Sequence, residues 1–400
     1  MLKYFSFVTA GESHGKGLLA IVDGVPAGTP VDAEQIRLEL ARRQKGHGRG
    51  GRMKIEKDAA EIYTGVRLGE ALGSPIGLLI PNRDWENWRV SMSVEPVNGA
   101  TDGELRRVTL PRPGHADLVG TLKYDRDDAR DILERSSARE TTARVAVGAI
   151  AKRLLSEFGI DIGSHVVSLA GIETRRLEGD GYPKDINAVA DPSPVRCLDR
   201  AAEAQMIEAI DAAKAAGDTA GGVIEVVARG LPVGLGSHVA WDRRLDARLA
   251  GALMSIQAMK GVELGLGFEA SLLPGSQVHD EIEADPTRLT SGGFRRLSNR
   301  AGGLEGGMTN GEPLVARLAM KPLSTLMRPL RSVDLESREA GSAVRERSDV
   351  TAVPAAGVVG EAMVAIVLAD AMREKFAGDS LSDMRANYDA YLNRLARSGG

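Results

Sequence analysis

The chain has few of the residues that mark several large classes of protein. Its 400 residues include one cysteine, Cys197, which excludes an internal disulfide, a disulfide-stapled secreted fold and a thiolate metal cluster. Aromatic residues make up 4% and the formal net charge is −4, so neither stacking platforms nor a basic field for nucleic acid is expected. No apolar run reaches the roughly 18 residues of a membrane span, and the N-terminus has no signal-peptide core. We therefore expect a cytoplasmic protein with no nucleic-acid and no membrane partner.

Glycine, by contrast, is abundant, with 47 residues in 400, where a share of roughly 7% is typical. The glycines form short clusters between apolar runs and do not form a low-complexity tract. Hydrophobic residues make up 43% of the chain, which is ordinary for a globular protein. The composition therefore predicts a folded protein with many turns and with backbone that approaches a ligand closely.

Apolar periodicity predicts a mixed arrangement of strands and helices. Short apolar runs bounded by Gly or Pro predict strands at 18–24 and 75–81. Longer amphipathic or Ala-rich segments predict helices at 32–45, 139–158, 202–216, 243–260, 354–376 and 381–396. The polar stretch 172–200 carries Gly and Pro, which favours an irregular connector.

A weak internal repeat crosses that connector. Residues 17–28 resemble 222–234, and 73–82 parallel 311–322; an Arg-containing loop and an Ala/Val-rich helix follow in each half. We interpret this as two similar halves, about 17–158 and 222–376, within one domain spanning 1–400. Coincidence among Gly-Pro turns is the alternative. If the halves are related, the functional site is expected between them.

Three clusters in the first 120 residues place His and Arg beside glycine. GESHGKG (11–17) puts His14 on a polar, glycine-rich loop. RRQKGHGRGGR (42–52) reads as a mobile anion clamp, a solvated loop or an Arg-Gly RNA-binding segment; His47 within it is given no catalytic role. In PRPGHAD (111–117), two prolines fix the directions of Arg112 and His115.

Three further clusters follow. ERSSARETT (134–142) opens the long helix and is either an anion site or a simple helix cap. NRAGGLEGGMTNG (299–311), followed by KPLST (321–325), implies tight backbone passage around a ligand, and RERSD (345–349) precedes another helix. The six histidines have no metal-ligand spacing, so no metal is expected, and no Walker A loop or nicotinamide fingerprint is present.

Taken in order from about residue 5 to 376, these motifs resemble those of the chorismate synthase family. The resemblance implies a lyase that carries out a trans-1,4-elimination on 5-enolpyruvylshikimate 3-phosphate. Phosphate leaves C3, a hydrogen leaves C6, and chorismate forms as the last step of the shikimate pathway. Reduced FMN is required without net redox change. The implied fold is of the α/β (α+β) class, a β-α-β sandwich with antiparallel sheets around a helical layer and two pseudo-symmetric halves, assembled as a homotetramer.

The resemblance also implies roles for individual residues. The implied catalytic groups are His14 near the phosphate, His115 near flavin N1, and Asp349, which assists flavin N5 as the base toward the C6 hydrogen. The implied substrate-binding residues are Ser13, Arg43, Arg49, Arg52, Arg112, Arg139 and Arg347. The implied FMN-binding residues are Arg135, Ser136, Ser137, Gln257, Ala258, Gly306, Lys321, Pro322, Leu323, Ser324, Thr325 and Arg347.

Two other classes of function compete with the lyase. One is an FMN-dependent oxidoreductase that acts on an anionic substrate; the other is a non-catalytic Arg/Gly anion or RNA binder. Each uses only one or two of the six clusters, whereas the lyase uses all six. The motifs leave open whether the flavin is reduced by NADPH on this chain or by a separate reductase. They also leave open which histidine protonates which group.

Overall fold

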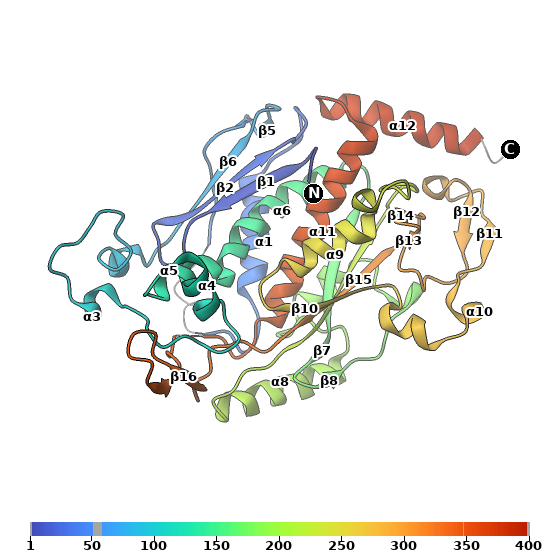
Figure 1. Cartoon of the computed structure of the whole chain (residues 1–400). Coiled ribbons are helices and arrows are strands. Elements are labelled where there is room, and N and C mark those ends of the chain that lie inside the picture. The colour runs from blue at the N-terminus through green and yellow to red at the C-terminus, as the bar shows by residue number, and fades with distance from the viewer. Residues whose placement is uncertain (1, 51–57, 347, 398–400) are drawn as a thin grey trace.

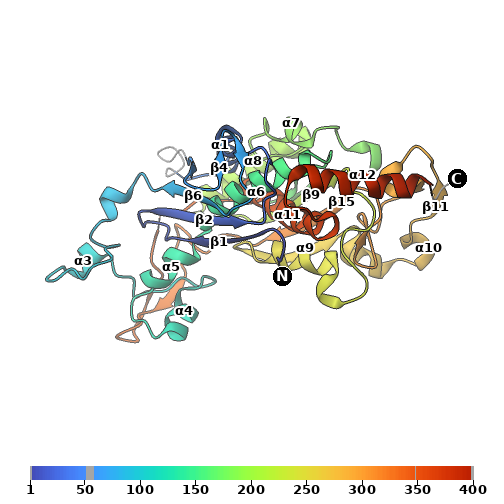
Figure 2. The same ribbon diagram turned by 90° about the horizontal axis from the view of Figure 1, so that it is seen from above.

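The computed structural model describes residues 2–50, 58–346 and 348–397. A layer of helices lies between two antiparallel sheets (Figures 1 and 2). The layer is formed by α1 (Ala33–Gln44), α6 (Thr141–Ser156), α9 (Leu245–Met254) and α11 (Val353–Phe376). Helix α6 packs against the first sheet, and α11 packs against both α6 and the second sheet. This is the β-α-β sandwich of mixed class that the motifs predicted.

Both sheets are antiparallel throughout. The first has the strand order β1-β2-β6-β3 and is formed by β1 (Ser6–Ala10), β2 (Gly17–Asp23), β6 (Ile76–Pro81) and β3 (Glu61–Ile62). The second has the order β10-β15-β9-β7-β8 and is formed by β10 (Met259–Leu264), β15 (Leu314–Met320), β9 (Gly222–Arg229), β7 (Asp161–Leu169) and β8 (Ile172–Glu173).

Many of the remaining elements lie at the two ends of the sandwich. At one end in Figure 1 are α3 (Asp102–Leu105), α4 (Asp117–Tyr124), α5 (Arg130–Ser136) and the hairpin β16 (Arg331–Val333) with β17 (Ala340–Ser342). At the other end are α10 (Gly275–Val278) and two hairpins, β11 (Ile282–Ala284) with β12 (Phe294–Arg296) and β13 (Leu304–Glu305) with β14 (Met308–Thr309). Elsewhere lie α7 (Ile186–Ala190), α8 (Arg200–Ala215), α12 (Leu381–Arg397) and the hairpin β4 (Val66–Arg67) with β5 (Glu70–Ala71).

Helix α11 forms the centre of the core. By length and composition alone it could cross a membrane, but all of its most apolar window is buried inside this fold, as in a core helix. Small residues let its neighbours approach closely: a Cβ added to Gly148 of α6 would lie 2.3 Å from the Cβ of Ala362. The long Ala/Gly-rich helices therefore pack at short range, which explains their small side chains.

The structure confirms most of the predicted elements and corrects two. The helix predicted over 243–260 spans only Leu245–Met254; Ala258 then takes a left-handed φ of +67° and the chain enters β10. The helix predicted from residue 139 begins at Thr141, after a separate short helix α5 and a 3-10 turn. The connector 172–200 is mostly irregular and contains the short elements β8 and α7. The internal repeat stays a prediction, although its two segment pairs do form two antiparallel strand pairs, β2 with β6 and β9 with β15.

Candidate functional site

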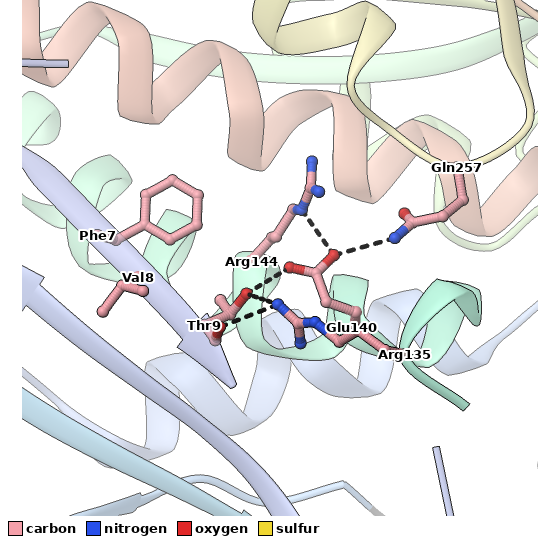
Figure 3. A pocket seen from close by; sticks show the side chains of 7 residues that line it. All are labelled: Phe7, Val8, Thr9, Arg135, Glu140, Arg144 and Gln257. Carbon is pink, nitrogen blue, oxygen red and sulfur yellow. Dashed lines mark hydrogen bonds and ion pairs between the residues drawn. The ribbon is translucent and has the colours of Figure 1, made fainter. Parts of the chain in front are cut away.

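The start of α6 is the point at which the predicted loops converge. Glu140, which ends the 3-10 turn before α6, accepts a hydrogen bond from Thr9 Oγ1 on β1 (2.7 Å) (Figure 3). It also accepts from Gln257 Nε2 (3.1 Å) and Arg144 Nε (2.8 Å). Arg135 donates to the carbonyl and hydroxyl oxygens of Thr9. These five side chains, with Phe7 and Val8, line a pocket of about 340 Å³.

The amide of Gln257 has a defined orientation in this pocket. An ionised carboxylate can only accept hydrogen bonds, so Nε2 of Gln257 faces Glu140. Burial raises the pKa of Glu140, but the Arg144 charge and the hydrogen bonds from Thr9 and Gln257 outweigh burial and lower it, which keeps the carboxyl ionised. Oε1 of Gln257 is buried and has no hydrogen-bond partner within the described residues. The pocket therefore holds a preset acceptor for an N–H or O–H of a bound molecule.

A second contact joins this pocket to the loop 111–117. The backbone carbonyl of Ala258 accepts a hydrogen bond from the N–H of Lys321 (3.0 Å). Lys321 Nζ in turn donates to the carbonyl of Gly114 (2.9 Å), and Thr325 Oγ1 accepts from Arg112 Nη1 (2.9 Å). Burial and the nearby charge of Lys260 lower the pKa of Lys321. The loop 111–117 and the run KPLST (321–325) are thus adjacent in space.

Asp117 fixes the directions of Arg112 and His115. It is fully buried at the first residue of α4 and accepts hydrogen bonds from Arg112 N (3.0 Å), Arg112 Nε (2.8 Å) and His115 Nδ1. Burial raises its pKa, but the hydrogen bonds and charges of His115 and Arg112 outweigh burial and hold the pKa well below the usual range. The acceptor at Nδ1 aims the opposite edge of the His115 ring away from Asp117.

Replacing Asp117 with asparagine is therefore expected to lower the free energy of unfolding by about 1.5–3 kcal/mol, the usual worth of hydrogen bonds to a charged group. Arg112 and His115 would share one neutral acceptor in place of a carboxylate. Urea unfolding measures the change. The control is Asp127→Asn, whose side chain is 79% exposed and lies near Arg107. Equal stability of the two variants would contradict the role given to Asp117.

His14 is held by a buried carboxylate from α5. Its Nδ1 lies 2.9 Å and 3.0 Å from the two carboxyl oxygens of Glu134, and its backbone N–H donates to the same group (2.8 Å). Arg130 Nη1 also binds Glu134 (2.9 Å). Burial raises the pKa of Glu134. The hydrogen bonds and charge of His14 and the charge of Arg130 lower this pKa by more, so its net shift is downward. His14 is thus a fixed imidazole, and the glycine-rich loop is well packed here.

A group of buried arginines lies on the other side of the α6 start. Arg43 Nε donates to Thr141 Oγ1 (3.0 Å), and its Nη1 lies 3.6 Å from Asp58. Arg139 Nη1 lies 3.3 Å from the same carboxylate. Burial lowers the pKa of Arg43 to about 10, with Arg49 and Arg139 contributing and Asp58 opposing. Two guanidinium groups on one buried carboxylate leave net positive charge for an anion.

The loop 46–50 is bound to the segment that follows residue 347. Arg49 Nη1 forms an ion pair with Asp349 Oδ2 (3.1 Å), and the N–H of Gly50 donates to Asp349 Oδ1 (2.6 Å). The carbonyl of Gly48 accepts from Val350 N (2.8 Å). Asp349 therefore forms an ion pair with an arginine of the second cluster. Arg52 and Arg347 lie outside the described residues.

The chain is similar along nearly its whole length to proteins of one kind. The sequence profile of the family described as chorismate synthase matches residues 5–373. The chain belongs to the chorismate synthase family. It is 58% identical over 397 residues to the chorismate synthase of Geobacter sulfurreducens, covering 98% of each protein, and 54% identical over 400 residues to that of Aquifex aeolicus, covering 98% of this chain and 99% of the other. A crystal structure of chorismate synthase aligns with a TM-score of 0.79 at 45% identity, covering 99% of this chain and 100% of the other.

These matches confirm the family, the lyase class and the mixed sandwich fold that the motifs predicted. A chorismate synthase is an enzyme of the shikimate pathway with a small-molecule substrate. The roles of individual residues in this chain remain predictions. Several of those residues lie together at the start of α6: Ser13 Oγ lies 3.3 Å from Ser137 Oγ, and Ser137 Oγ accepts a hydrogen bond from the N–H of Arg139.

Three predicted cofactor residues, Gly306, Ser136 and Leu323, have other surroundings in the chain. Gly306 forms the turn between β13 and β14, at the end of the sandwich opposite α4 and α5 (Figure 1). The chain by itself does not bring this turn to the pocket beside Glu140. Ser136 ends α5, and its hydroxyl donates to the carbonyl of Leu133 (3.4 Å). Leu323 contributes a carbonyl that accepts from Thr219 (2.7 Å).

The residues that orient the site were not singled out from the sequence. Asp117, Glu134 and Glu140 lie inside the motifs PRPGHAD and ERSSARETT, beside the histidine and arginines that drew attention. A carboxylate next to a candidate His or Arg is the signal that could have found them. Trp88, whose ring stacks on the His14 ring, lies in no motif, and this contact depends on the tertiary fold.

Proposed function

We propose that this chain converts 5-enolpyruvylshikimate 3-phosphate into chorismate by trans-1,4-elimination of phosphate, with reduced FMN and without net redox change. One observation carries the proposal: loops far apart in the sequence bring Arg43, Arg49 and Arg139, largely buried and held by carboxylates, to the start of α6, and Arg112 is held in the same way by Asp117. A substrate with one phosphate and two carboxylates needs such a set of fixed cations. The motif resemblance adds Arg52 and Arg347 to the proposed substrate-binding arginines.

The residues present fit a flavin. Oε1 of Gln257 is a buried acceptor that has no partner among the described residues, and an N–H or hydroxyl group of a flavin could donate to it. Arg135, Lys321 and the hydroxyls of Ser137, Ser324 and Thr325 would hold its phosphate and ring oxygens. Reduced FMN supplies an electron-rich ring and, at N5, a base for the C6 hydrogen. The protein supplies orientation, positive charge and the exclusion of water.

The two histidines have matched supports and different neighbours. His14, held by Glu134, is proposed to give a proton to the departing phosphate. His115, held by Asp117 and next to Arg112, is proposed to adjust the charge of the flavin at N1. Asp349, paired with Arg49, is proposed to orient the group that takes the C6 hydrogen.

The proposal is tested by incubating the protein without oxygen with reduced FMN and 5-enolpyruvylshikimate 3-phosphate. Chorismate and phosphate are expected in equal amounts, with the flavin still reduced at the end. Absence of both products from folded, flavin-bound protein would overturn the proposal. Consumption of one reductant per product would instead favour the oxidoreductase. NADPH is proposed as the reductant, used directly or through a separate reductase; turnover with NADPH, oxidised FMN and purified protein alone distinguishes the two. A cytoplasmic location is part of the proposal.

The outer face of the first sheet supports the proposed homotetramer. Val8 lies opposite Ile21, and Leu19 lies opposite Leu79, so these side chains share one face of the sheet. Val8 is 61% exposed, Leu19 49% and Ile21 51%. An antiparallel sheet that faces water normally carries polar side chains on that face. A continuous apolar face of this kind fits the same face of a second copy.

Replacing Ile21 with lysine is therefore expected to shift the protein toward smaller assemblies in analytical ultracentrifugation. A charge at the centre of an apolar contact between copies has no partner and is costly to bury. The control is Val94→Lys, at a residue 83% exposed and outside the sheet. An unchanged assembly in the Ile21 variant would remove this face from the interface.

A further inference from the structure

The indole of Trp88 covers one face of the His14 imidazole. The two ring centres are 3.6 Å apart and the planes differ by 19°, which is a stacked arrangement. Trp88 ends a 3-10 turn, Trp85–Trp88. This turn belongs to the projecting segment 83–107, which also contains α3 (Figures 1 and 2). It is only 7% exposed although that segment lies at the periphery. Its Nε1 donates to Asp84 Oδ2 (3.0 Å), which fixes the plane of the indole.

The guanidinium of Arg106 lies over the same indole, 3.9 Å from the ring centre. Arg106 takes a left-handed φ of +52° where α3 ends, a conformation that residues with a side chain rarely adopt. Its Nη2 also donates to the carbonyl of Asn87 (3.0 Å), beside Trp88. The segment 83–107 thus clamps its own tryptophan.

A continuous series of contacts leads from the edge of the His14 ring back to its face. Glu134 holds the Nδ1 edge of His14, and Arg130 Nη1 holds Glu134 (2.9 Å). Arg130 Nε donates to the carbonyl of Arg106 (2.6 Å), and the side chain of Arg106 returns to the indole that stacks on His14. The edge and the face of the imidazole are therefore fixed by two segments that are tied to one another through Arg130.

We infer that Trp88 is a positioning residue for His14. The inference rests on the proposed function, in which His14 supplies a proton to the leaving phosphate. A hydrogen bond at Nδ1 alone leaves the imidazole able to tilt about that bond, since the last torsion of histidine has broad minima. A stacked indole removes that freedom. Proton transfer depends on distance and angle, and a misplacement of about 1 Å can cost roughly 10²-fold in rate.

The test compares Trp88→Phe, which keeps an aromatic face, with Trp88→Met, which keeps apolar volume only. In the methionine variant kcat is expected to fall roughly 10- to 100-fold while KM and FMN affinity change little. The phenylalanine variant is expected to recover most of kcat. Trp241→Met is the control, because Trp241 is 82% exposed and lies in the 3-10 turn Trp241–Arg243 just before α9.

A spectroscopic measurement separates positioning from simple packing. The ring protons of His14, assigned by comparison with His14→Asn, are expected upfield in the wild type because they lie over the indole. Their chemical shifts should move downfield in the methionine variant. In the phenylalanine variant the shifts should lie between those of the wild type and those of the methionine variant. This measurement does not require the methionine variant to be stable enough for kinetics. Normal kcat in the methionine variant, equal losses in both variants, or ring protons without an upfield shift would each overturn the inference. Lack of chorismate formation by the wild type would instead overturn the proposed function.

Discussion

Replacing His14 with alanine is expected to lower kcat for chorismate formation by roughly 10²-fold or more, the usual contribution of a general acid. The carboxyl oxygens of Glu134 lie 2.9 Å and 3.0 Å from Nδ1, so the ring is held as a proton donor needs to be. Single-turnover measurements with enzyme in excess isolate the chemical step. Turnover within about twofold of wild type would remove the acid role from His14.

The matched control for this change is His47→Ala. His47 also lies beside a carboxylate, that of Asp211 (2.7 Å), but the His47 side chain is 35% exposed and that of Asp211 58%. Its loss is expected to leave kcat unchanged. The His14 side chain has more contacts than its glycine-rich loop suggests. The ring packs on Trp88, and its removal leaves Glu134 with one hydrogen-bond partner fewer. We therefore expect His14→Ala to lower stability as well, so kcat is measured well below the unfolding temperature.

Replacing Glu361 with glutamine is expected to lower the free energy of unfolding by roughly 3–5 kcal/mol, the cost of breaking a buried ionic group by removing one charge. Glu361 is fully buried within α11 and binds Arg42 (2.9 Å), Lys152 (2.5 Å) and Arg196 (3.0 Å). It thereby ties α11 to α1, to α6 and to the connector before α8. Without its charge, three cations lose their common partner.

Chemical unfolding of both variants measures this effect. Glu283→Gln is the control, since Glu283 pairs with Arg295 at the surface and exposed pairs are worth about 0–1 kcal/mol. A loss at Glu361 no larger than at Glu283 would contradict the role given to the buried network.

The same carboxylate makes stability depend on pH. Burial raises the pKa of Glu361, but the charges of Arg42, Lys152 and Arg196 outweigh burial and lower it. Burial likewise raises the pKa of Glu225, but the hydrogen bonds from His165, Tyr182 and Arg317 bring it to about 2. A carboxyl whose pKa is lowered by folding stabilises the protein above its unfolded pKa of about 4.3, and this contribution is lost as pH falls toward the folded value. Glu361→Gln should therefore flatten the decline of stability below about pH 4.5.

The long helices could be predicted because their sequences are locally self-consistent. Segments 354–376 and 381–396 lie where composition and periodicity place them. Residues 243–260 could not be divided correctly from local pattern, because β10 exists only through its pairing with β15. The strand is stabilised by a partner more than 50 residues away in the chain, which no local propensity reports.

The sequence by itself determined the family, the class of fold and the loops that bear arginine and histidine, since each motif is a run of neighbouring residues whose order is specific. Only the tertiary structure decided which carboxylate holds which group. Glu134 meets His14 across 120 residues, and Glu140 meets Gln257 across 117. Such contacts depend on how α5 and α6 pack against β1 and the end of α9, and therefore on the whole core. The tertiary structure likewise brought Trp88 onto His14 and left Gly306 at the far end of the sandwich.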